Sequence, residues 1–246
     1  MSIYVDAYCT LGIDREYDLT TSALLAFMDE AGVAKALVAP VDRLQCVDNA
    51  EGNAFIARAA AAHSDRLIAT CTANPWYGRK ACEELRCRVN DGARMLVLNP
   101  FVQGYQANDE LVWPLLEASA TERIPVYIHT GTPGNATPWQ IVDLAVRYPE
   151  LDLIMGHCGA TDFWNDVVPA CSRAPNITLE SSNARPFLFA NYLAVIGPHR
   201  GVVGSAAPLT RLTCEWEQMR TVMPPTHWNA VAGGNMMRLL EKRGPL

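Results

Sequence analysis

Two of the five histidines have the setting of acid–base groups. His129 and His157 end the apolar runs PVYIHT and LDLIMGH, and glycine follows each within two residues. An imidazole titrates near neutral pH, so it can take up and release a proton during a reaction. We predict His157 as the general acid or base. His129 is predicted as a second acid–base group or as a hydrogen-bond partner of the substrate.

The stretch IYVDAYCTLG, residues 3–12, sets an acid, a phenol and a hydroxyl at alternate positions. Alternate side chains of a strand point to the same face, so Asp6, Tyr8 and Thr10 are expected to share one face. The Tyr8 phenol could then donate a hydrogen bond to an oxyanion that forms on the substrate.

Polar residues also follow the other apolar runs. The guanidinium groups of Arg43 and Arg185 match the shape of a carboxylate, and hydroxyl and amide side chains could hold other polar atoms of a substrate. Asp6 and Glu180 have the alternative role of supporting the fold by hydrogen bonds. The predicted substrate-binding residues are Asp6, Thr10, Arg43, Asn99, Glu180, Arg185 and Ser205.

Short apolar runs and longer amphipathic segments alternate along the chain. The apolar runs predict strands over residues 3–8, 34–40, 66–72, 93–98, 125–130, 151–157, 176–181 and 201–206. Continuous apolar runs are typical of parallel strands buried on both faces. The segments between them predict helices over residues 20–32, 49–63, 79–92, 111–122, 138–148, 161–172, 185–197 and 209–222, with an extra C-terminal helix over 227–243.

This alternation predicts a (β/α)8 TIM barrel, an α/β fold, as one domain over residues 1–246. A doubly wound open sheet is the alternative, but no glycine-rich fingerprint follows the first strand. In a barrel the active site lies at the carboxyl ends of the strands. The candidate residues named above all lie at or just after predicted strand ends.

Composition excludes some classes of partner. The net charge is −6 and basic residues form no long run, so we expect no nucleic-acid partner. No apolar stretch has the length of a membrane span, and the N-terminus lacks the pattern of a signal peptide. The eight cysteines form no CxxC pair, which indicates free thiols and a cytoplasmic location.

Several motifs together resemble one known family. IYVDAYCTLG, AGVAKALVAP, PVYIHTGTPG, LDLIMGHCGA, VVGSAAP and GNMMRLLE occur in the order seen in the amidohydrolase superfamily. The chain is most similar to the amidohydrolase-related branch that contains aminocarboxymuconate-semialdehyde decarboxylase-like enzymes. The resemblance spans the whole chain and implies the same (β/α)8 barrel.

The resemblance also implies a metal site whose ligands are mostly missing here. The family has Asp-x-His-x-His in its first strand, whereas this chain has Asp6, Tyr8 and Thr10. The family aspartate after Gly-Ser in strand 8 is Ala206 here, so only His129 survives of four usual ligand positions. We therefore expect no metal and no other cofactor, because a catalytic zinc normally has three protein ligands. A rebuilt site around His129, His157, Cys9 and Cys158 is the alternative.

Three functions stay open on this basis. The first is a metal-independent hydrolase that acts on a small lactone, ester or related carboxylate by His/Tyr acid–base chemistry. A lactone hydrolase of the related branch works without metal, but its strand-8 aspartate is absent here. The second is a metal-free lyase, such as a decarboxylase, dehydratase or cyclase. The third is an inactive barrel that acts as a binding protein or subunit. The expected partners are a small-molecule substrate, with carboxylates as candidates, and a second copy in a homodimer, but no membrane.

An enzyme should show a concave, mostly apolar pocket in which His129, His157 and Tyr8 converge within hydrogen-bond reach of one point. An inactive barrel would more often fill that mouth with side chains.

Overall fold

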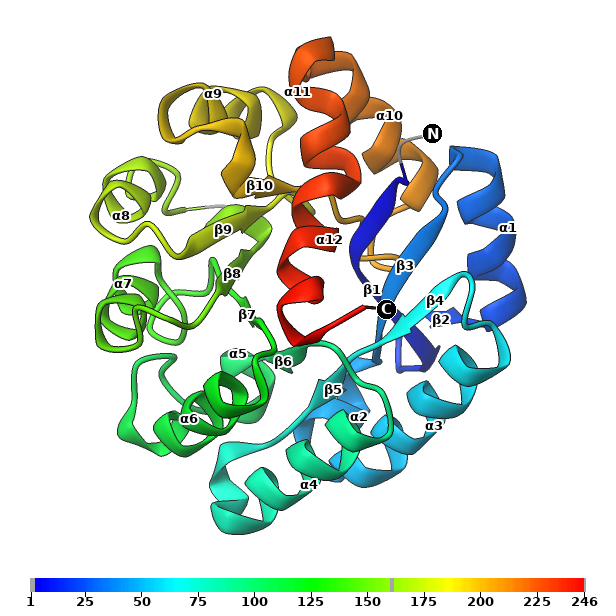
Figure 1. Ribbon diagram of the computed structural model, residues 1–246, viewed down its shortest axis with the longest axis vertical. Coiled ribbons are helices and arrows are strands. Elements are labelled where there is room, and N and C mark those ends of the chain that lie inside the picture. Colours follow the sequence, from blue (N-terminus) through cyan, green and yellow to red (C-terminus); the bar gives the residue numbers. More distant parts are fainter. Residues whose placement is uncertain (1–2, 160–161, 246) are drawn as a thin grey trace.

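Parallel strands form a closed barrel in the computed structural model, which describes residues 3–159 and 162–245 (Figure 1). The predicted (β/α)8 fold is confirmed. Each predicted strand is found, and Thr70 divides one of them into β4 and β5. The barrel strands are β1 (Val5–Ile13), β3 (Lys35–Pro40), β4 (Leu67–Ala69), β5 (Cys71–Thr72), β6 (Leu96–Leu98), β7 (Val126–His129), β8 (Leu153–Gly156), β9 (Ile177–Glu180) and β10 (Gly201–Val202).

Backbone hydrogen bonds between the first and last strands close the barrel. The amide of Ala7 donates to the carbonyl of Val203 at 2.9 Å, and the amide of Thr10 donates to Ala207 at 2.8 Å. In the other direction the Ala206 amide donates to Tyr8 at 2.9 Å. We call this seam between β1 and β10 the closure seam. It brings residues that are far apart in the sequence to the same side of the barrel.

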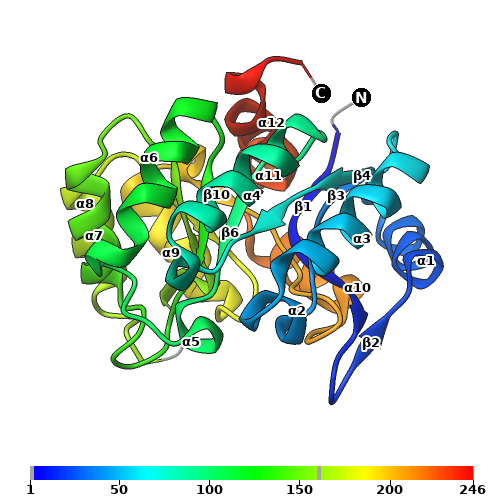
Figure 2. The ribbon, with the colours of Figure 1, turned by 90° about the horizontal axis from the view of Figure 1, so that it is seen from below.

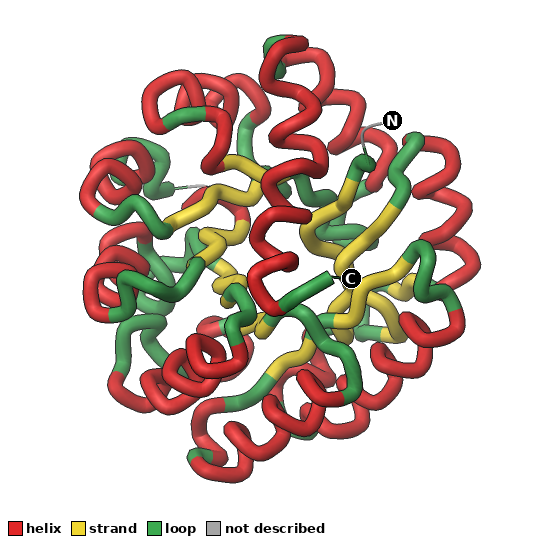
Figure 3. The backbone as a smooth tube through the Cα atoms, viewed as in Figure 1, coloured by secondary structure: helices red, strands yellow, loops and turns green. Residues whose placement is uncertain are grey.

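Helices surround the strands on all sides (Figure 3). None of the described helices is long and apolar enough to cross a membrane. The main outer helices are α1 (Thr21–Ala31), α3 (Asn49–Ala62), α4 (Arg79–Asn90), α6 (Trp113–Glu122), α7 (Pro138–Arg147), α8 (Val167–Arg173), α9 (Pro186–Ile196) and α10 (Leu212–Val222).

Local sequence accounts for several helix ends. The Thr20 hydroxyl accepts from the Ala23 amide at the start of α1, and Gly32 ends that helix with a φ of 70°. The predicted helix over 161–172 is shorter than expected, because α8 begins only at Val167. Residue 161 of that prediction lies outside the described residues.

The C-terminal segment lies across the amino-terminal end of the barrel (Figures 1 and 2). It consists of α11 (Pro225–Asn229), a π-helical turn (Ala230–Gly234) and α12 (Asn235–Leu240). Met236 and Leu239 of α12 belong to the same buried cluster as Val5 and Leu37 of the barrel interior. The interior is therefore filled by side chains, and only its other end is available for a site.

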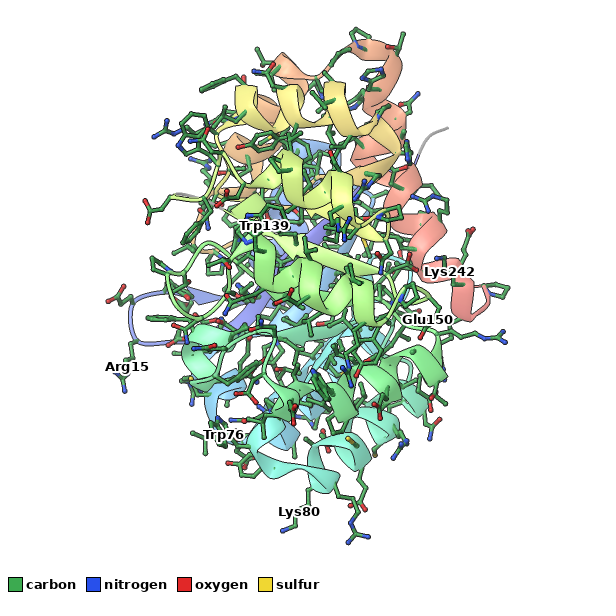
Figure 4. The ribbon with its side chains drawn as sticks, turned by 90° about the vertical axis from the view of Figure 1, so that its left-hand side faces the viewer. Arg15, Trp76, Lys80, Trp139, Glu150 and Lys242 are labelled. Atoms are coloured by element: carbon green, nitrogen blue, oxygen red, sulfur yellow. The ribbon has the colours of Figure 1, made fainter. Side chains whose placement is uncertain are left out.

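Three short elements were not predicted. Strand β2 (Asp18–Leu19) pairs with the end of β1 in an antiparallel hairpin, and α2 (Asp42–Cys46) and α5 (Pro100–Gln103) follow β3 and β6. The hairpin projects from the end of the barrel opposite α12 (Figure 2). Arg15 of the hairpin and Lys242 lie at opposite edges of the molecule (Figure 4). All three elements lie around the carboxyl ends of the strands, where a barrel site is expected.

Candidate functional site

A β-bulge in β1 decides which side chains enter the barrel. Asp6 pairs with Ala36 and Cys9 pairs with Val38. The two residues of β1 between Asp6 and Cys9 therefore lie opposite the single residue of β3 between Ala36 and Val38. A bulge shifts the alternation of side chains by one position. Asp6 therefore turns outward to the indole of Trp216 in α10, while Tyr8 turns inward. The prediction that Asp6 shares a face with Tyr8 is wrong for this reason.

Asp6 supports the fold behind the site. The side chain is fully buried, and its Oδ1 accepts from the backbone amides of Tyr8 at 3.1 Å and Ser205 at 3.0 Å. Its Oδ2 accepts from the Trp216 indole at 3.0 Å. Burial raises the pKa of Asp6 from its usual 3.8 to about 6, although these donors act in the opposite direction. These contacts match the supporting role that is the predicted alternative for Asp6, and its substrate-binding role stays a prediction.

Glu180, at the end of β9, is also fully buried and does not face the substrate side. Its Oε2 accepts from the Tyr127 hydroxyl at 2.8 Å, the His157 amide at 3.1 Å and the Ser182 hydroxyl at 2.8 Å. Its Oε1 accepts from the Ser182 amide at 2.6 Å. A Cβ atom at Gly204 would overlap the Glu180 carboxylate, so a glycine is needed there. These contacts match the supporting role that is the predicted alternative for Glu180, and substrate binding by Glu180 stays a prediction.

Five polar side chains form one continuous hydrogen-bonded series, which we call the site chain. The Tyr8 hydroxyl lies 2.9 Å from Nε2 of His129, and Nδ1 of His129 lies 3.0 Å from Nε2 of His157. Nδ1 of His157 lies 2.8 Å from the hydroxyl of Ser182, which donates to Glu180. Of the three residues predicted as catalytic, Tyr8 and His157 thus each contact His129, which ends β7.

Burial determines the charge of these groups. Burial, and then the charge of neighbouring His157, hold the pKa of His129 well below 6.5. Burial also lowers the pKa of His157, against the opposing effect of Glu180. Burial and the charge of Asp42 raise the pKa of the Tyr8 phenol well above 10. Near neutral pH the site chain therefore contains two uncharged imidazoles and an uncharged phenol. These groups are able to exchange protons without a prior change of charge.

Sequence reasoning missed two residues that touch the site chain. The ring of Tyr127 stacks on that of Tyr8 with centroids 4.5 Å apart. Tyr127 lies two residues before His129 in β7, so strand alternation could have identified it. The Gln45 amide nitrogen lies 3.5 Å from the Tyr8 hydroxyl and donates to the Pro40 carbonyl at 2.7 Å. Gln45 comes from α2, and no pattern in the sequence indicated it.

Three small polar residues predicted to bind substrate have local structural contacts. The Thr10 hydroxyl donates to the Ala207 carbonyl at 3.4 Å, and the Asn99 side chain caps α5. Ser205 is fully buried, and its hydroxyl accepts from the Ala207 amide at 3.1 Å. These contacts hold the backbone around the site, and substrate binding by the three residues stays a prediction.

The two predicted arginines lie in different places. Arg43 donates to the Ile13 carbonyl and lines a cleft of about 490 Å³ between the hairpin and α3, away from the site chain. Arg185 lines a small cavity of about 30 Å³ together with His157, Cys158 and Trp164. Of the two, Arg185 is therefore the one positioned to meet a group bound beside His157.

The donor set does not fit the metal that the family resemblance implies. Within residues 3–159 and 162–245, no group of three or more histidine, cysteine or acidic side chains could hold a metal ion. The thiols of Cys9 and Cys158 donate to the carbonyls of Leu37 and Glu180, and burial raises the pKa of each. A thiol ligates metal as the thiolate, so the rebuilt site around these cysteines is not supported.

Comparison with known proteins gives the family and the fold. The amidohydrolase family model matches residues 13–239. No match is found among curated proteins. Among solved structures, 5-carboxyvanillate decarboxylase from Sphingomonas paucimobilis has a TM-score of 0.80 at 18% identity, covering 98% of this chain and 99% of that chain. 2,6-Dihydroxybenzoate decarboxylase from Rhizobium has a TM-score of 0.75 at 15% identity, covering 99% of this chain and 100% of that chain.

A third structure, 5-carboxyvanillate decarboxylase from Novosphingobium aromaticivorans, is complexed with manganese. It has a TM-score of 0.80 at 15% identity and covers 97% of this chain and 96% of that chain. At these identities the structures establish the shared barrel, and the family model establishes the relationship. This chain therefore belongs to the amidohydrolase family of enzymes.

Proposed function

We propose that this protein is a metal-independent lyase that decarboxylates a small hydroxylated aromatic acid. The observation that carries the proposal is the site chain, in which a phenol and two uncharged imidazoles are linked at the carboxyl ends of the strands. This arrangement suits proton transfer, and its donor set does not suit the family metal.

Tyr8 and His129 are the proposed proton-transfer pair. Both nitrogens of His129 are engaged by protein groups, Nε2 by Tyr8 and Nδ1 by His157. A substrate must therefore separate Tyr8 from His129. The phenol then donates to a substrate oxygen, while Nε2 of His129 becomes available to exchange a proton with the substrate.

Arg185 is the proposed contact for the substrate carboxylate. The cavity of about 30 Å³ beside Arg185 and His157 has the size of a carboxylate and not of a ring. Trp164, which is about half exposed at this cavity, is available to contact a ring that lies outside it. In decarboxylation Nε2 of His129 takes the proton of the substrate hydroxyl and passes it to the ring carbon. The carbon–carboxylate bond then breaks, its electron pair returns to the ring, and carbon dioxide leaves.

The names of the structural neighbours support this substrate class. They act on 5-carboxyvanillate and 2,6-dihydroxybenzoate, which are hydroxylated aromatic acids. The chain shares their barrel, although the manganese bound to one of them has no matching ligand set here.

Hydrolysis of a lactone or ester is the second candidate. One observation favours it: the Tyr8 hydroxyl, a donor for a carbonyl oxygen, lies beside a neutral imidazole that could activate water. The buried state of Asp6 and Glu180 weighs against it, since neither carboxylate is available as the base for water.

The test is turnover by metal-stripped protein of two panels, hydroxybenzoic acids and small lactones. Release of carbon dioxide that is lost in Tyr8→Phe and His129→Gln, but kept in Tyr105→Phe and His63→Gln, is the expected result. The controls are a buried tyrosine and a histidine outside the site chain. Lactone opening alone would replace the lyase by the hydrolase. Binding without turnover in either panel would favour a binding protein, and turnover that requires added manganese would overturn metal independence.

A further inference from the structure

We infer that the hydrogen bonds of the site chain run in one direction, from Tyr8 to Glu180. In this arrangement Ser182 and Glu180 are positioning residues that hold His129 and His157 as Nδ1–H tautomers. The inference deepens the proposed function and rests on it for its catalytic meaning, but its test does not require turnover.

The direction is set at the Glu180 end. The backbone N–H groups of His157 and Ser182 can only donate, and both are aimed at the Glu180 carboxylate. Together with the hydroxyls of Tyr127 and Ser182 they supply four donors, three to Oε2 and one to Oε1, so the Glu180 carboxyl group acts as the acceptor in all four contacts. The Ser182 hydroxyl therefore donates its hydrogen to Glu180 and offers a lone pair to its other neighbour.

That neighbour is Nδ1 of His157, at 2.8 Å from the Ser182 hydroxyl. The same nitrogen lies 3.3 Å from the Ser182 backbone carbonyl, which can only accept. Two acceptors thus face Nδ1 of His157, so this nitrogen carries the hydrogen. Nε2 of His157 is then left with a lone pair.

The same reasoning continues outward to Tyr8. The lone pair on Nε2 of His157 requires a donor, so Nδ1 of His129, at 3.0 Å, carries a hydrogen. Nε2 of His129 is then an acceptor for the Tyr8 hydroxyl at 2.9 Å. The Gln45 amide agrees with this direction: its NH2 group is fixed by the Pro40 carbonyl, so it can only donate to the Tyr8 oxygen.

The catalytic consequence is a defined role for Nε2 of His129. When a substrate replaces Tyr8 at this nitrogen, a new N–H bond forms as the substrate's bond to hydrogen breaks, and the bonding electron pair stays on the substrate. The positive charge then spreads over the His129 imidazole. Its other N–H, on Nδ1, points along the site chain toward buried Glu180. Ser182 and Glu180 stabilise this state without touching the substrate.

Side-chain nitrogen NMR of 15N-histidine-labelled protein tests the direction. The signals of His129 and His157 are assigned with His129→Gln and His157→Gln, and His63, His199 and His227 serve as references within the chain. We expect both site histidines to be uncharged near neutral pH, with hydrogen on Nδ1 and a bare Nε2. A hydrogen on Nε2 of either ring, or a doubly protonated ring, would overturn the inference.

The positioning roles are tested with Ser182→Ala and a matched control, Ser181→Ala. Ser181 is its buried neighbour, but its hydroxyl contacts Gly204 and not the site chain. In Ser182→Ala the Nδ1–H of His157 should exchange with water about tenfold faster, since one hydrogen bond is lost. The exchange rate of this hydrogen should be unchanged in Ser181→Ala.

Equal exchange in the two variants would remove the role of Ser182. The wild-type tautomers still test the direction if a variant does not fold. Correct tautomers without turnover of either panel would refute only the proposed function.

Discussion

Replacing Asp6 by asparagine should have opposite effects on stability at low and high pH. Asp6 is fully buried, and its pKa rises from the usual 3.8 to about 6 in the folded protein. The folded state therefore binds this proton more tightly than the unfolded state. Its contribution to stability is complete below about pH 4 and is lost as the pH rises through about 6.

The size of the effect follows from the shift in pKa. The rise of the pKa from 3.8 to about 6 corresponds to about 3 kcal/mol, and full burial means that solvent does not screen it. Asparagine does not titrate, so the variant does not lose this stability as the pH rises. Its oxygen can still accept from the amides of Tyr8 and Ser205, which share one carboxylate oxygen in the native protein.

The asparagine NH2 group, however, would face the Trp216 indole N–H, which in the native protein donates to Oδ2 of Asp6. A buried donor without a partner costs about 1–3 kcal/mol at every pH. Asp6→Asn should therefore be less stable than the native protein by about that amount near pH 4. Near pH 8 it should be equal in stability or more stable, because the native protein has lost about 3 kcal/mol.

Urea unfolding followed by circular dichroism at steps from about pH 4 to about pH 8 measures the difference. Asp18→Asn, at an exposed acid of β2, is the control and should show little change with pH. The lowered pKa values of the buried histidines affect both proteins alike, so they cancel in the difference. A variant that becomes less stable as the pH rises would refute the reasoning. It would mean that the three donors outweigh burial and keep Asp6 ionised.

Three further predictions concern the site. Gly204→Ala should lower the free energy of unfolding by about 1–3 kcal/mol and reduce activity, because its Cβ overlaps Glu180; an unchanged urea midpoint would show that Glu180 is free to move. Arg185→Gln should raise KM for a carboxylate substrate roughly tenfold with little change in kcat; an equal loss in kcat would instead give Arg185 a role in the transition state. The acid limb of the kcat/KM–pH profile should lie below pH 6.5, since His129 must be neutral to accept a proton and its pKa is lowered; a limb above that value would contradict the assignment.

The barrel was predictable because its signals are local. Each strand is a short apolar run, and turn and cap residues such as Thr20 and Gly32 mark helix ends. The hairpin strand β2 and helices α2 and α5 were not predicted, since two to five residues carry too little periodicity. The late start of α8 was missed for another reason: residues 162–166 precede an apolar run but adopt mainly turns, and their side chains have only moderate helix propensity.

The candidate site was predicted only in part. His129, His157 and Tyr8 were identified because strand ends in a barrel converge, and the structure brings them into contact. Asp6 was misplaced because a bulge depends on the pairing of two strands, which alternation within one strand does not reveal. Gln45 depends on the path of α2 around the barrel, a property of tertiary packing. The homodimer and the cytoplasmic location stay predictions.

The closure seam has a consequence for the order of folding. Tyr8 reaches His129 across the barrel only after β1 has joined β10, through bonds such as that from Ala7 to Val203. Contacts between residues so distant in sequence form late, because the intervening chain must first lose its freedom. During refolding, helices and neighbouring strand pairs should therefore appear before the proton-transfer groups meet, so recovery of activity should lag behind recovery of the helical signal.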